Sequence, residues 1–274
     1  MANTLNYLDY NLETREETPF LGHVAQPGTG APGRTGANKV DQLLSAIGDD
    51  DRLKVDHRNF NTYPWCAICR LQLVAQNGSE YIGTGWLAYS RLVITAAHNL
   101  FNPDALGGYT KAISVRPGCM DGKDLVPPLA AQRILVTDQW KSRQRPDDDI
   151  GGIVLPNAID HLGWFAYDVS GAHARQGDRV TICGYPQDSP EHPMQHSEAI
   201  VKIDPGSLWY KVDTMPGQSG APIWMDIPGS EMKMVVGIHT NDETLAPSHL
   251  GEVNRGTRIS SRVAELITRW ARSI

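Results

Sequence analysis

The stretch VDTMPGQSGAPIW, from Val212 to Trp224, places one serine, Ser219, beside glycines, directly after a strand-like run and directly before another. Glycine permits backbone conformations with positive φ and lets other groups approach closely. Such a setting suits backbone amides that must point at a developing negative charge, and it equally suits a simple turn. The rest of the chain has to separate these two interpretations.

Short apolar runs bounded by turn residues recur on both sides of this stretch, from Asp56 onward. They are enriched in Val, Ile and Thr and are interrupted by Gly, Pro and Asp, which is typical of an all-β domain. The last segment, SSRVAELITRWARS, breaks this pattern, because its apolar residues fall at helical spacing with charges between them. We therefore expect many strands followed by one C-terminal helix, with Val263, Leu266, Ile267 and Trp270 on its buried face.

The composition limits the classes of partner. The chain has 274 residues, of which 41% are hydrophobic and 20% charged, which is enough for a sizeable core in one large or two small domains. A formal net charge of -6 without a basic cluster disfavours nucleic acid. No apolar run approaches the roughly 20 residues that span a bilayer, so no membrane partner is expected.

The N-terminal part differs from the remainder. Residues 1–24 are polar and acidic, and residues 25–38 are rich in Gly, Pro and Ala, which predicts a linker or a mobile arm. Residues 40–47 fit a short helix or an extended arm. The first residues lack the basic and then apolar regions of a secretory signal peptide.

The cysteines do not indicate a metal or redox centre. Cys66 and Cys69 form a CxxC inside WCAICRLQLV, a run typical of a strand. Residues three apart on a strand point to opposite faces, which is a poor geometry for sharing one metal. We expect structural cysteines, and we expect neither a metal nor a cofactor.

Most of the histidines fall in polar segments. A serine hydroxyl needs a base to become a nucleophile, and histidine is the usual one. The prolines of PEHPMQH prevent a helical pair of metal-binding histidines there. We expect five of the nine histidines to be solvated loop residues: His161, His173, His192, His196 and His249.

His98 differs from these five because it follows RLVITAA, a strand that ends in small residues and leaves room around an imidazole. Such a base needs a buried acceptor on its far nitrogen. The acidic run Asp147–Asp149 is the candidate source. A solvated turn is the alternative for this run, but Asp149 directly precedes an apolar strand, so we expect it to be the one carried inward.

TAAH around His98, D-I-x-x-I-x-L from Asp149 and GQSGAP around Ser219 resemble the His, Asp and Ser segments of chymotrypsin-like serine peptidases, in that family's chain order. Within it, the chain is most similar to the bacterial glutamyl endopeptidases of the staphylococcal and Bacillus type. The similarity extends from about Ser45 to the C-terminal helix. Six segments match in order: IGDDDRLKV (47–55), YPWCAI (63–68), TGWL (84–87), CGYPQD (183–188), YKVDTMPGQSG (210–220) and VVGIH (235–239).

The resemblance implies two six-stranded antiparallel β-barrels of chymotrypsin-like type with a C-terminal α-helix. The peptidase domain would span 45–274, with the barrel boundary near 156–178. His98 would be the general base and then the general acid, Asp149 would orient it, and Ser219 would attack the scissile carbonyl. The backbone N–H groups of Gly217 and Ser219 would form the oxyanion hole.

The resemblance also assigns a specificity pocket to Thr214 and His239. A hydroxyl and an imidazole can hydrogen-bond a carboxylate, so we expect cleavage after Glu, with Asp weaker. The alternative is that the two residues only line a strand pair. TNDET after His239 replaces a segment that tends to be glycine-rich in the family, and its acids would repel an acidic substrate.

In the glutamyl group the mature N-terminus lies near this pocket, which implies a position near Ser45–Ile47 here. Residues 1–44 then resemble a propeptide, or a retained regulatory arm, and we expect cleavage near Leu44 to raise activity. The trypsin-type activation partner is absent, because Gln218 occupies its position.

Two positions bear on location. Related secreted enzymes often carry a disulfide where this chain has Gly83 and Asn99. The loss of that bridge fits a reducing compartment. We therefore expect a cytoplasmic protein, with secretion from a longer precursor as the alternative.

Two other functions stay open at this stage. One is an inactive protease-like binding module. The other is an intracellular protease with a single protein target, activated by a regulatory partner that docks on residues 1–44.

Overall fold

A computed structural model describes residues 5–20, 47, 49–240 and 248–274. Its first strands are β1 (Tyr7–Asn11), β2 (Glu17–Phe20), β3 (Leu53–Lys54), β4 (Ile68–Val74), β5 (Glu80–Tyr89), β6 (Leu92–Thr95), β7 (Phe101–Asn102), β8 (Gly108–Tyr109), β9 (Ala112–Pro117), β10 (Leu129–Ala130), β11 (Arg133–Thr137) and β12 (Gly151–Val154). The remaining strands are β13 (Ala166–Tyr167), β14 (Arg179–Gly184), β15 (Met194–Ile203), β16 (Ser207–Tyr210), β17 (Pro222–Asp226), β18 (Lys233–His239) and β19 (Asn254–Arg258). The α-helices are α1 (Asp138–Arg143) and α2 (Ser261–Arg272), and the 3-10 helices are η1 (His57–Asn59), η2 (Trp65–Ala67), η3 (Ala97–Asn99), η4 (Pro146–Asp148), η5 (Asp160–Leu162) and η7 (Ser248–Leu250).

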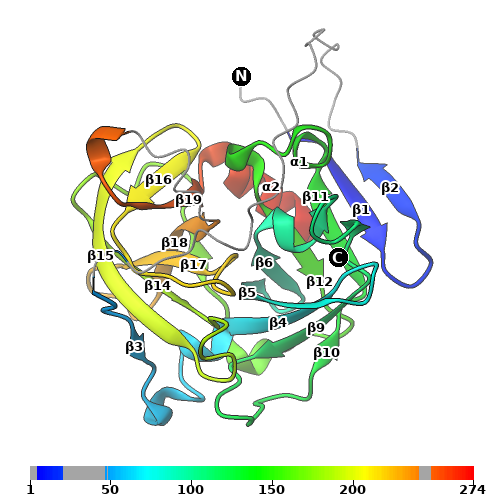
Figure 1. Ribbon diagram of the computed structural model, residues 1–274, viewed down its shortest axis with the longest axis horizontal. Helices are drawn as coiled ribbons and strands as arrows, with labels where there is room; N and C mark the ends of the chain where they lie inside the picture. The colour runs from blue at the N-terminus through cyan, green and yellow to red at the C-terminus, as the bar shows by residue number, and fades with distance from the viewer. Residues whose placement is uncertain (1–4, 21–46, 48, 241–247) are drawn as a thin grey trace, which may run out of the picture.

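The strands form two large sheets that lie side by side (Figure 1). A nine-stranded sheet has the order β10-β9-β4-β5-β6-β12-β11-β1-β2. An eight-stranded sheet has the order β13-β18-β17-β14-β15-β16-β19, and its eighth strand, β3, pairs with β15 off this path. In the second sheet β18 also pairs with β19, so β14 to β19 close into a ring of six antiparallel strands. The expected chymotrypsin-like two-barrel architecture is confirmed, and each sheet carries additional short strands at its edge.

The additional strands of the first sheet come from the N-terminal region. β1 pairs with β11 and β2 pairs with β1, both antiparallel. Apolar side chains of this hairpin are buried: Leu5, Tyr7, Leu8, Tyr10 and Leu12. The polar, acidic composition of residues 1–24 did not predict these strands. The hairpin lies along the edge of the first barrel, on the side away from the second (Figure 1).

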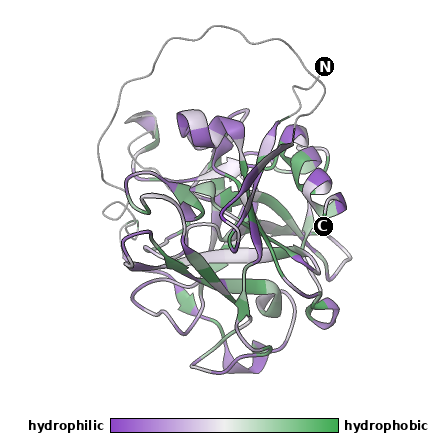
Figure 2. Cartoon of the chain, turned by 90° about the vertical axis from the view of Figure 1, so that its right-hand side faces the viewer, coloured by the Kyte–Doolittle hydropathy of each residue, from purple (hydrophilic) through white to green (hydrophobic). Residues whose placement is uncertain are grey.

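The C-terminal helix packs as its spacing predicts. Val263, Leu266, Ile267 and Trp270 are all at most 1% exposed. Ser260 caps the helix by accepting a hydrogen bond from the backbone N–H of Val263. The apolar face of α2 therefore joins the core of the first barrel, and hydrophobic residues gather on the strands while the loops are largely hydrophilic (Figure 2).

The cysteines lie in the interior. Cys66 sits in η2 rather than in the strand expected for WCAICRLQLV, and the strand β4 begins only at Ile68. All four cysteines are free and buried, and burial raises the pKa of each thiol, that of Cys119 to about 11. These thiols are therefore protonated at neutral pH and are poor metal ligands.

Within the described residues, no helix is long and apolar enough to cross a membrane.

Candidate active site

His98 is positioned by the end of β6, where the chain turns into η3. Ala96 and Ala97 are fully buried beside it, and their small side chains leave space for the imidazole. Asp149 binds His98 at two points: Oδ1 accepts from the backbone N–H of His98 at 2.9 Å, and Oδ2 lies 2.7 Å from Nδ1. A carboxylate only accepts, so the Nδ1 proton is fixed and Nε2 becomes the basic nitrogen.

The two other acids of the run have different partners. Asp147 accepts hydrogen bonds from Ser207 and Arg255. Asp148 forms an ion pair with Arg262 on α2 at 2.8 Å. Asp149, which is 5% exposed, is the member of the run that meets His98, as its place before β12 predicted.

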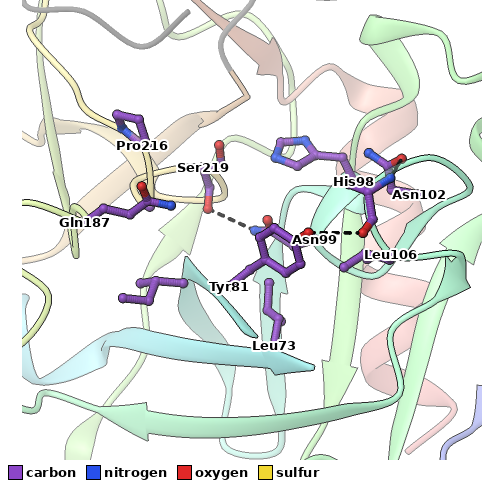
Figure 3. A pocket seen from close by; sticks show the side chains of 12 residues that line it. Leu73, Tyr81, His98, Asn99, Asn102, Leu106, Gln187, Pro216 and Ser219 are labelled. Carbon is purple, nitrogen blue, oxygen red and sulfur yellow. Dashed lines mark hydrogen bonds between the residues drawn. The ribbon is translucent and has the colours of Figure 1, made fainter. Parts of the chain in front are cut away.

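Ser219 lies in the loop between β16 and β17 and lines a pocket together with His98. Figure 3 shows the two side chains facing one another across this pocket. The pocket is lined by residues of both barrels: Leu73, Tyr81, Ile82, His98, Asn99, Asn102, Ala105, Leu106, Gln187, Pro216, Gly217 and Ser219.

Two backbone amides of the serine loop have no hydrogen-bond acceptor among the described residues. The carbonyl of Pro216 accepts from the backbone N–H of Gln187, and the carbonyl of Gln218 accepts from the backbone N–H of Ala221. In a trans peptide the N–H points opposite to the preceding carbonyl. The N–H groups of Gly217 and Ser219 therefore point away from these contacts, and within the described part of the chain neither donates a hydrogen bond.

The glycines of this loop are needed for their backbone geometry. Gly217 has φ +98° and Gly220 has φ +91°, in the left-handed region. A Cβ on Gly217 would lie 2.5 Å from the carbonyl oxygen of Tyr185, and one on Gly220 would lie 2.1 Å from that of Thr84. The glycines therefore do more than turn the chain: they let the serine loop lie closer to the carbonyls of Tyr185, in the second barrel, and Thr84, in the first, than a residue with a Cβ could.

The first barrel holds the serine loop through Thr84 and Asn99. The backbone N–H of Thr84 and Nδ2 of Asn99 both donate to the carbonyl oxygen of Ser219, at 2.9 and 3.0 Å. The hydroxyl of Thr84 donates to the carbonyl oxygen of Gly217 at 2.9 Å. The loop from the second barrel is thus fixed by residues that adjoin His98 or lie on β5.

Asn99 also fills the space over Gly83. A Cβ on Gly83 would lie 2.8 Å from Nδ2 of Asn99. These are the two positions where the resemblance places a disulfide in secreted relatives. Here the Asn99 amide occupies that place and connects to Thr95 and Ser219 by hydrogen bonds.

Thr214 and His239, the expected specificity residues, are both fully buried. Oγ1 of Thr214 and Nε2 of His239 have no hydrogen-bond partner among the described residues. Leaving a buried polar atom unpaired costs about 1–3 kcal/mol, so both atoms are available to a partner from outside the described residues. His239 adjoins the serine loop, because its carbonyl accepts from the backbone N–H of Gly220 at 2.7 Å.

Tyr210 determines which nitrogen of His239 carries the proton. Its hydroxyl lies 2.7 Å from both Nδ1 of His239 and the carbonyl oxygen of Arg255. The carbonyl can only accept, so the hydroxyl donates to it and accepts from Nδ1–H. Nε2 of neutral His239 therefore presents a lone pair. Burial and, to a lesser degree, the nearby charge of His98 lower the pKa of His239 to about 3.

Asp213, next to Thr214, binds the backbone of the segment at Ile47 and Asp51. Its carboxylate accepts from the backbone N–H of Ile47 at 2.7 Å and of Asp51 at 3.0 Å. Gln218, at the position of the trypsin-type activation partner, is 1% exposed and is satisfied by backbone groups of Met215 and Met194.

Two histidines differ from their expected solvated state. His192 is 5% exposed, since both ring nitrogens have protein partners. His196 lies within β15, half-buried beside Asp213, rather than in a loop. The prediction of solvated loop histidines is wrong for both, because the stretch that carries them, PEHPMQH, pairs with β3 and with Val55, just ahead of η1. His161, His173 and His249 are exposed.

No protein-family model matches the chain. A search of curated proteins finds the glutamyl endopeptidase of Bacillus licheniformis, 30% identical over 238 residues, which is 84% of this chain and 70% of that protein. The chain belongs to the glutamyl endopeptidase family. It is a serine endopeptidase of this type. An uncharacterised protein, y4fB of Sinorhizobium fredii, is 24% identical, and the match spans 41% of its length.

Solved structures agree with the family on the fold. A Glu endopeptidase solved in complex with MPD has a TM-score of 0.70 at 22% identity, covering 84% of this chain and all of that one. The protease Anisep of Arthrobacter nicotinovorans has a TM-score of 0.58 at 19% identity, covering 74% of this chain and 94% of that one.

Sequence reasoning missed the residues that support the site. Asn99 was noted only for the absent disulfide, and Thr84 and Tyr210 only as parts of matching segments. Each acts through a hydrogen bond to a backbone carbonyl or a ring nitrogen far away in sequence. The signals in the sequence were that Asn99 directly follows His98, and that Thr84 and Tyr210 lie in segments that match the family.

Proposed function

We propose that this peptidase cleaves peptide bonds after glutamate, with aspartate weaker, through His98, Asp149 and Ser219. The observation that carries the proposal is the two-point contact of Asp149 with His98, beside a serine in the same pocket. This arrangement orients an imidazole whose second nitrogen is basic. It is the arrangement that activates a serine hydroxyl.

The reaction follows from these positions. Ser219 Oγ attacks the scissile carbonyl carbon while its proton passes to Nε2 of His98. The resulting imidazolium is stabilised by Asp149 and returns the proton to the leaving amine, which leaves an acyl-enzyme. A water molecule, deprotonated by His98, then releases the acid and restores Ser219.

The negative oxygen of each tetrahedral intermediate would be bound by the N–H groups of Gly217 and Ser219. Both amides point away from the hydrogen bonds that the preceding carbonyls, of Pro216 and Gln218, accept. Hydrogen bonds from Thr84 and Asn99 fix the carbonyls of Gly217 and Ser219 themselves. Donors held in place before the reaction need no reorganisation when charge develops, and each is worth about 2.7–4 kcal/mol in comparable enzymes.

Preference for glutamate is supported by the unpartnered atoms of Thr214 and His239. The Thr214 hydroxyl donates to a substrate carboxylate. Nε2 of His239 presents a lone pair while Nδ1 donates to Tyr210, so it binds a carboxylate only after taking up a proton. The negative charge of the bound substrate carboxylate favours the protonated form of His239, and so offsets the burial that lowers the pKa of His239 in the free enzyme.

Labelling with a fluorophosphonate tests the nucleophile. We expect the probe to modify Ser219, and Ser219→Ala or His98→Ala to lower kcat/KM by about 10⁴-fold or more. Asp149→Asn should lose activity heavily, whereas its matched neighbour Asp148→Asn keeps Asp149 and should not. Peptide hydrolysis by Ser219→Ala would contradict the proposal, and a folded wild type that is never labelled would favour the inactive binding module.

Profiling on peptide libraries tests the specificity. Thr214→Val and His239→Ala should reduce cleavage after Glu more than cleavage after uncharged residues. Equal losses on all peptides would assign these residues to structure alone.

We also propose that cutting the chain ahead of Ile47 raises activity. The Ile47 backbone N–H already faces the Asp213 carboxylate at 2.7 Å, beside Thr214. A cut there would place a cationic α-amino group next to the pocket for an acidic side chain, as the family resemblance implies. No Glu closely precedes this bond, so a peptidase that cleaves after Glu is not expected to make the cut itself. N-terminal sequencing of the active form tests this, and full activity with Met1 in place would contradict it.

The cytoplasmic location and a regulatory partner for residues 1–44 stay predictions. Cell fractionation tests the first. Pull-down with the full chain, compared with a chain lacking residues 1–44, tests the second.

A further inference from the structure

Three side chains from distant segments meet outside the active-site pocket. His57 starts η1, Asp121 lies in the loop after β9, and His192 lies in the loop before β15. One ligand atom of each lies within 4.8 Å of the other two. None of the three is among the residues that line the pocket of Ser219. The peptidase mechanism therefore does not explain why they gather.

Asp121 bridges the two imidazoles. Its Oδ1 lies 2.9 Å from Nδ1 of His192, and its Oδ2 lies 3.2 Å from Nδ1 of His57. The two rings stand nearly perpendicular, at 84°, with centroids 5.2 Å apart. Both histidines thus present the same ring nitrogen to one carboxylate. Two imidazole nitrogens and a carboxylate form a donor set typical of zinc.

The hydrogen bonds of His192 leave room for either a metal ion or a proton between its Nδ1 and Asp121. Its Nε2 lies 2.8 Å from the carbonyl oxygen of Val55, which only accepts, so the ring proton is on Nε2. In the neutral ring Nδ1 then carries a lone pair that faces a carboxylate oxygen at 2.9 Å. Two acceptors at this distance repel unless a metal ion or a second ring proton lies between them.

The contact with Val55 is also what a metal-bound histidine shows. Such a histidine usually donates its other N–H to a carbonyl or carboxylate, which fixes its tautomer and orientation. His192 is 5% exposed, so it is held in place by the protein rather than by solvent. The side chain of His57 is 74% exposed and has the freedom to adjust to a metal at about 2.0–2.1 Å.

We propose that His57, Asp121 and His192 bind one divalent transition-metal ion of the zinc class, with water completing the coordination. The ion would join the segment that opens the peptidase domain to loops beside β9 and β15. Its role is structural, since no ligand lines the active-site pocket. In the sequence, His192 is a metal candidate only together with its neighbours in PEHPMQH. Asp121 and His57 lie 71 and 135 positions earlier in the chain, too far for a local pattern to connect them with His192.

A second group, Asp51, His196 and Asp213, is a weaker candidate. The Asp213 oxygens already accept from the backbone N–H groups of Ile47 and Asp51. Nδ1 of His196 accepts from the backbone N–H of Asp213 at 2.8 Å. The lone pairs of Asp213 and of His196 Nδ1 are therefore already used in hydrogen bonds within the protein.

Co²⁺ titration of the full chain after chelator treatment tests the proposal. We expect one equivalent to bind with the visible absorption of a four-coordinate N/O site, and Zn²⁺ to displace it. Saturating Zn²⁺ should raise Tm by about 5 °C or more, because it binds the folded state alone.

Variants locate the site. Asp121→Asn and His57→Ala should weaken Co²⁺ binding at least as much as the roughly 10–100-fold that loss of an outer partner costs. His57 is exposed, so its replacement leaves folding intact. His173→Ala is the matched control, because His173 pairs with Asp168 at 2.7 Å without a second histidine and should bind Co²⁺ as the wild type does.

Three results would overturn the proposal: no Co²⁺ binding by the folded wild type, binding unchanged in His57→Ala and Asp121→Asn, or binding lost in His196→Gln instead. The first would assign a proton, and not a metal, to the contact between His192 and Asp121. Peptidase activity is not the readout, so these outcomes are independent of the function proposed for Ser219.

Discussion

Replacing Tyr7 by alanine tests whether the N-terminal hairpin is an integral part of the first barrel. The Tyr7 side chain is 2% exposed and packs edge-on against Trp270, with centroids 6.0 Å apart and planes at 86°. The guanidinium of Arg269 lies 5.3 Å from its ring centroid. Removing the ring leaves a cavity between β1 and α2.

The expected cost follows from this burial. Replacing a fully buried aromatic side chain by alanine costs about 3–5 kcal/mol. For a domain of this size each kcal/mol lowers Tm by roughly 2–4 °C, so even the lower estimate predicts a drop of roughly 6–12 °C. Thermal unfolding followed by circular dichroism, with urea unfolding at 25 °C, measures the change.

Glu13→Ala is the matched control, because Glu13 is exposed in the turn of the same hairpin and its loss should leave Tm unchanged. A drop in Tm below about 2 °C for Tyr7→Ala would refute the argument, since it would mean that the hairpin leaves the barrel without cost. The outcome also bears on activation: if the hairpin is integral, a cut ahead of Ile47 leaves residues 5–20 attached through the sheet.

Three further predictions concern the active site. Asn99→Ala should lower kcat about tenfold or more with little change in KM, because it removes a contact that positions the serine loop, and displacement of reacting groups by about 1 Å slows catalysis. Steady-state kinetics on a peptide measures the effect, and an unchanged kcat would assign Asn99 to packing alone. Gly217→Ala should lower kcat about 10²–10³-fold in a folded protein, because its Cβ would press on the carbonyl of Tyr185 and displace an oxyanion donor; wild-type kcat would show that this amide is not needed. Because His239 has its pKa lowered to about 3 and must gain a proton to bind a carboxylate, the preference for Glu over Gln peptides should fall as pH rises above about 5, by up to about tenfold per unit; a ratio of kcat/KM constant between pH 5 and 8 would contradict the proton uptake.

The same pKa has a consequence for stability. The folded pKa of His239, about 3, lies below its ordinary value of 6.5, so the unfolded state binds more protons between these values. The contribution of His239 to stability is therefore complete above about pH 6.5 and is lost as pH falls toward 3. Urea unfolding of His239→Gln should show a weaker dependence on pH in this window than the wild type, and identical curves would contradict the assignment.

The fold was predictable from the sequence where local pattern and packing agree. Short Val/Ile runs became strands, and the spacing of Val263 to Trp270 gave a buried helical face. The hairpin of residues 5–20 was not predictable, because its acidic residues mask the pattern. Asp9 and Glu17 find partners in Arg133 and Lys141, which lie more than 120 positions away in the chain.

The site was predictable only in part for a similar reason. His98, Asp149 and Ser219 follow from short segments, and the choice of Asp149 within its run follows from the adjacent strand. The groups that hold the site in place are joined by contacts over 29 to 133 positions in the chain, which no local pattern reveals. The cluster of His57, Asp121 and His192 is hidden in the same way.

The carbonyl of Ser219 belongs to the second barrel, yet both of its hydrogen-bond donors belong to the first. The serine loop is therefore held in position only when both barrels have folded and packed together. A nascent chain that has folded only its first barrel holds His98 without Ser219. With the residues proposed for catalysis, cleavage therefore requires that both barrels have docked.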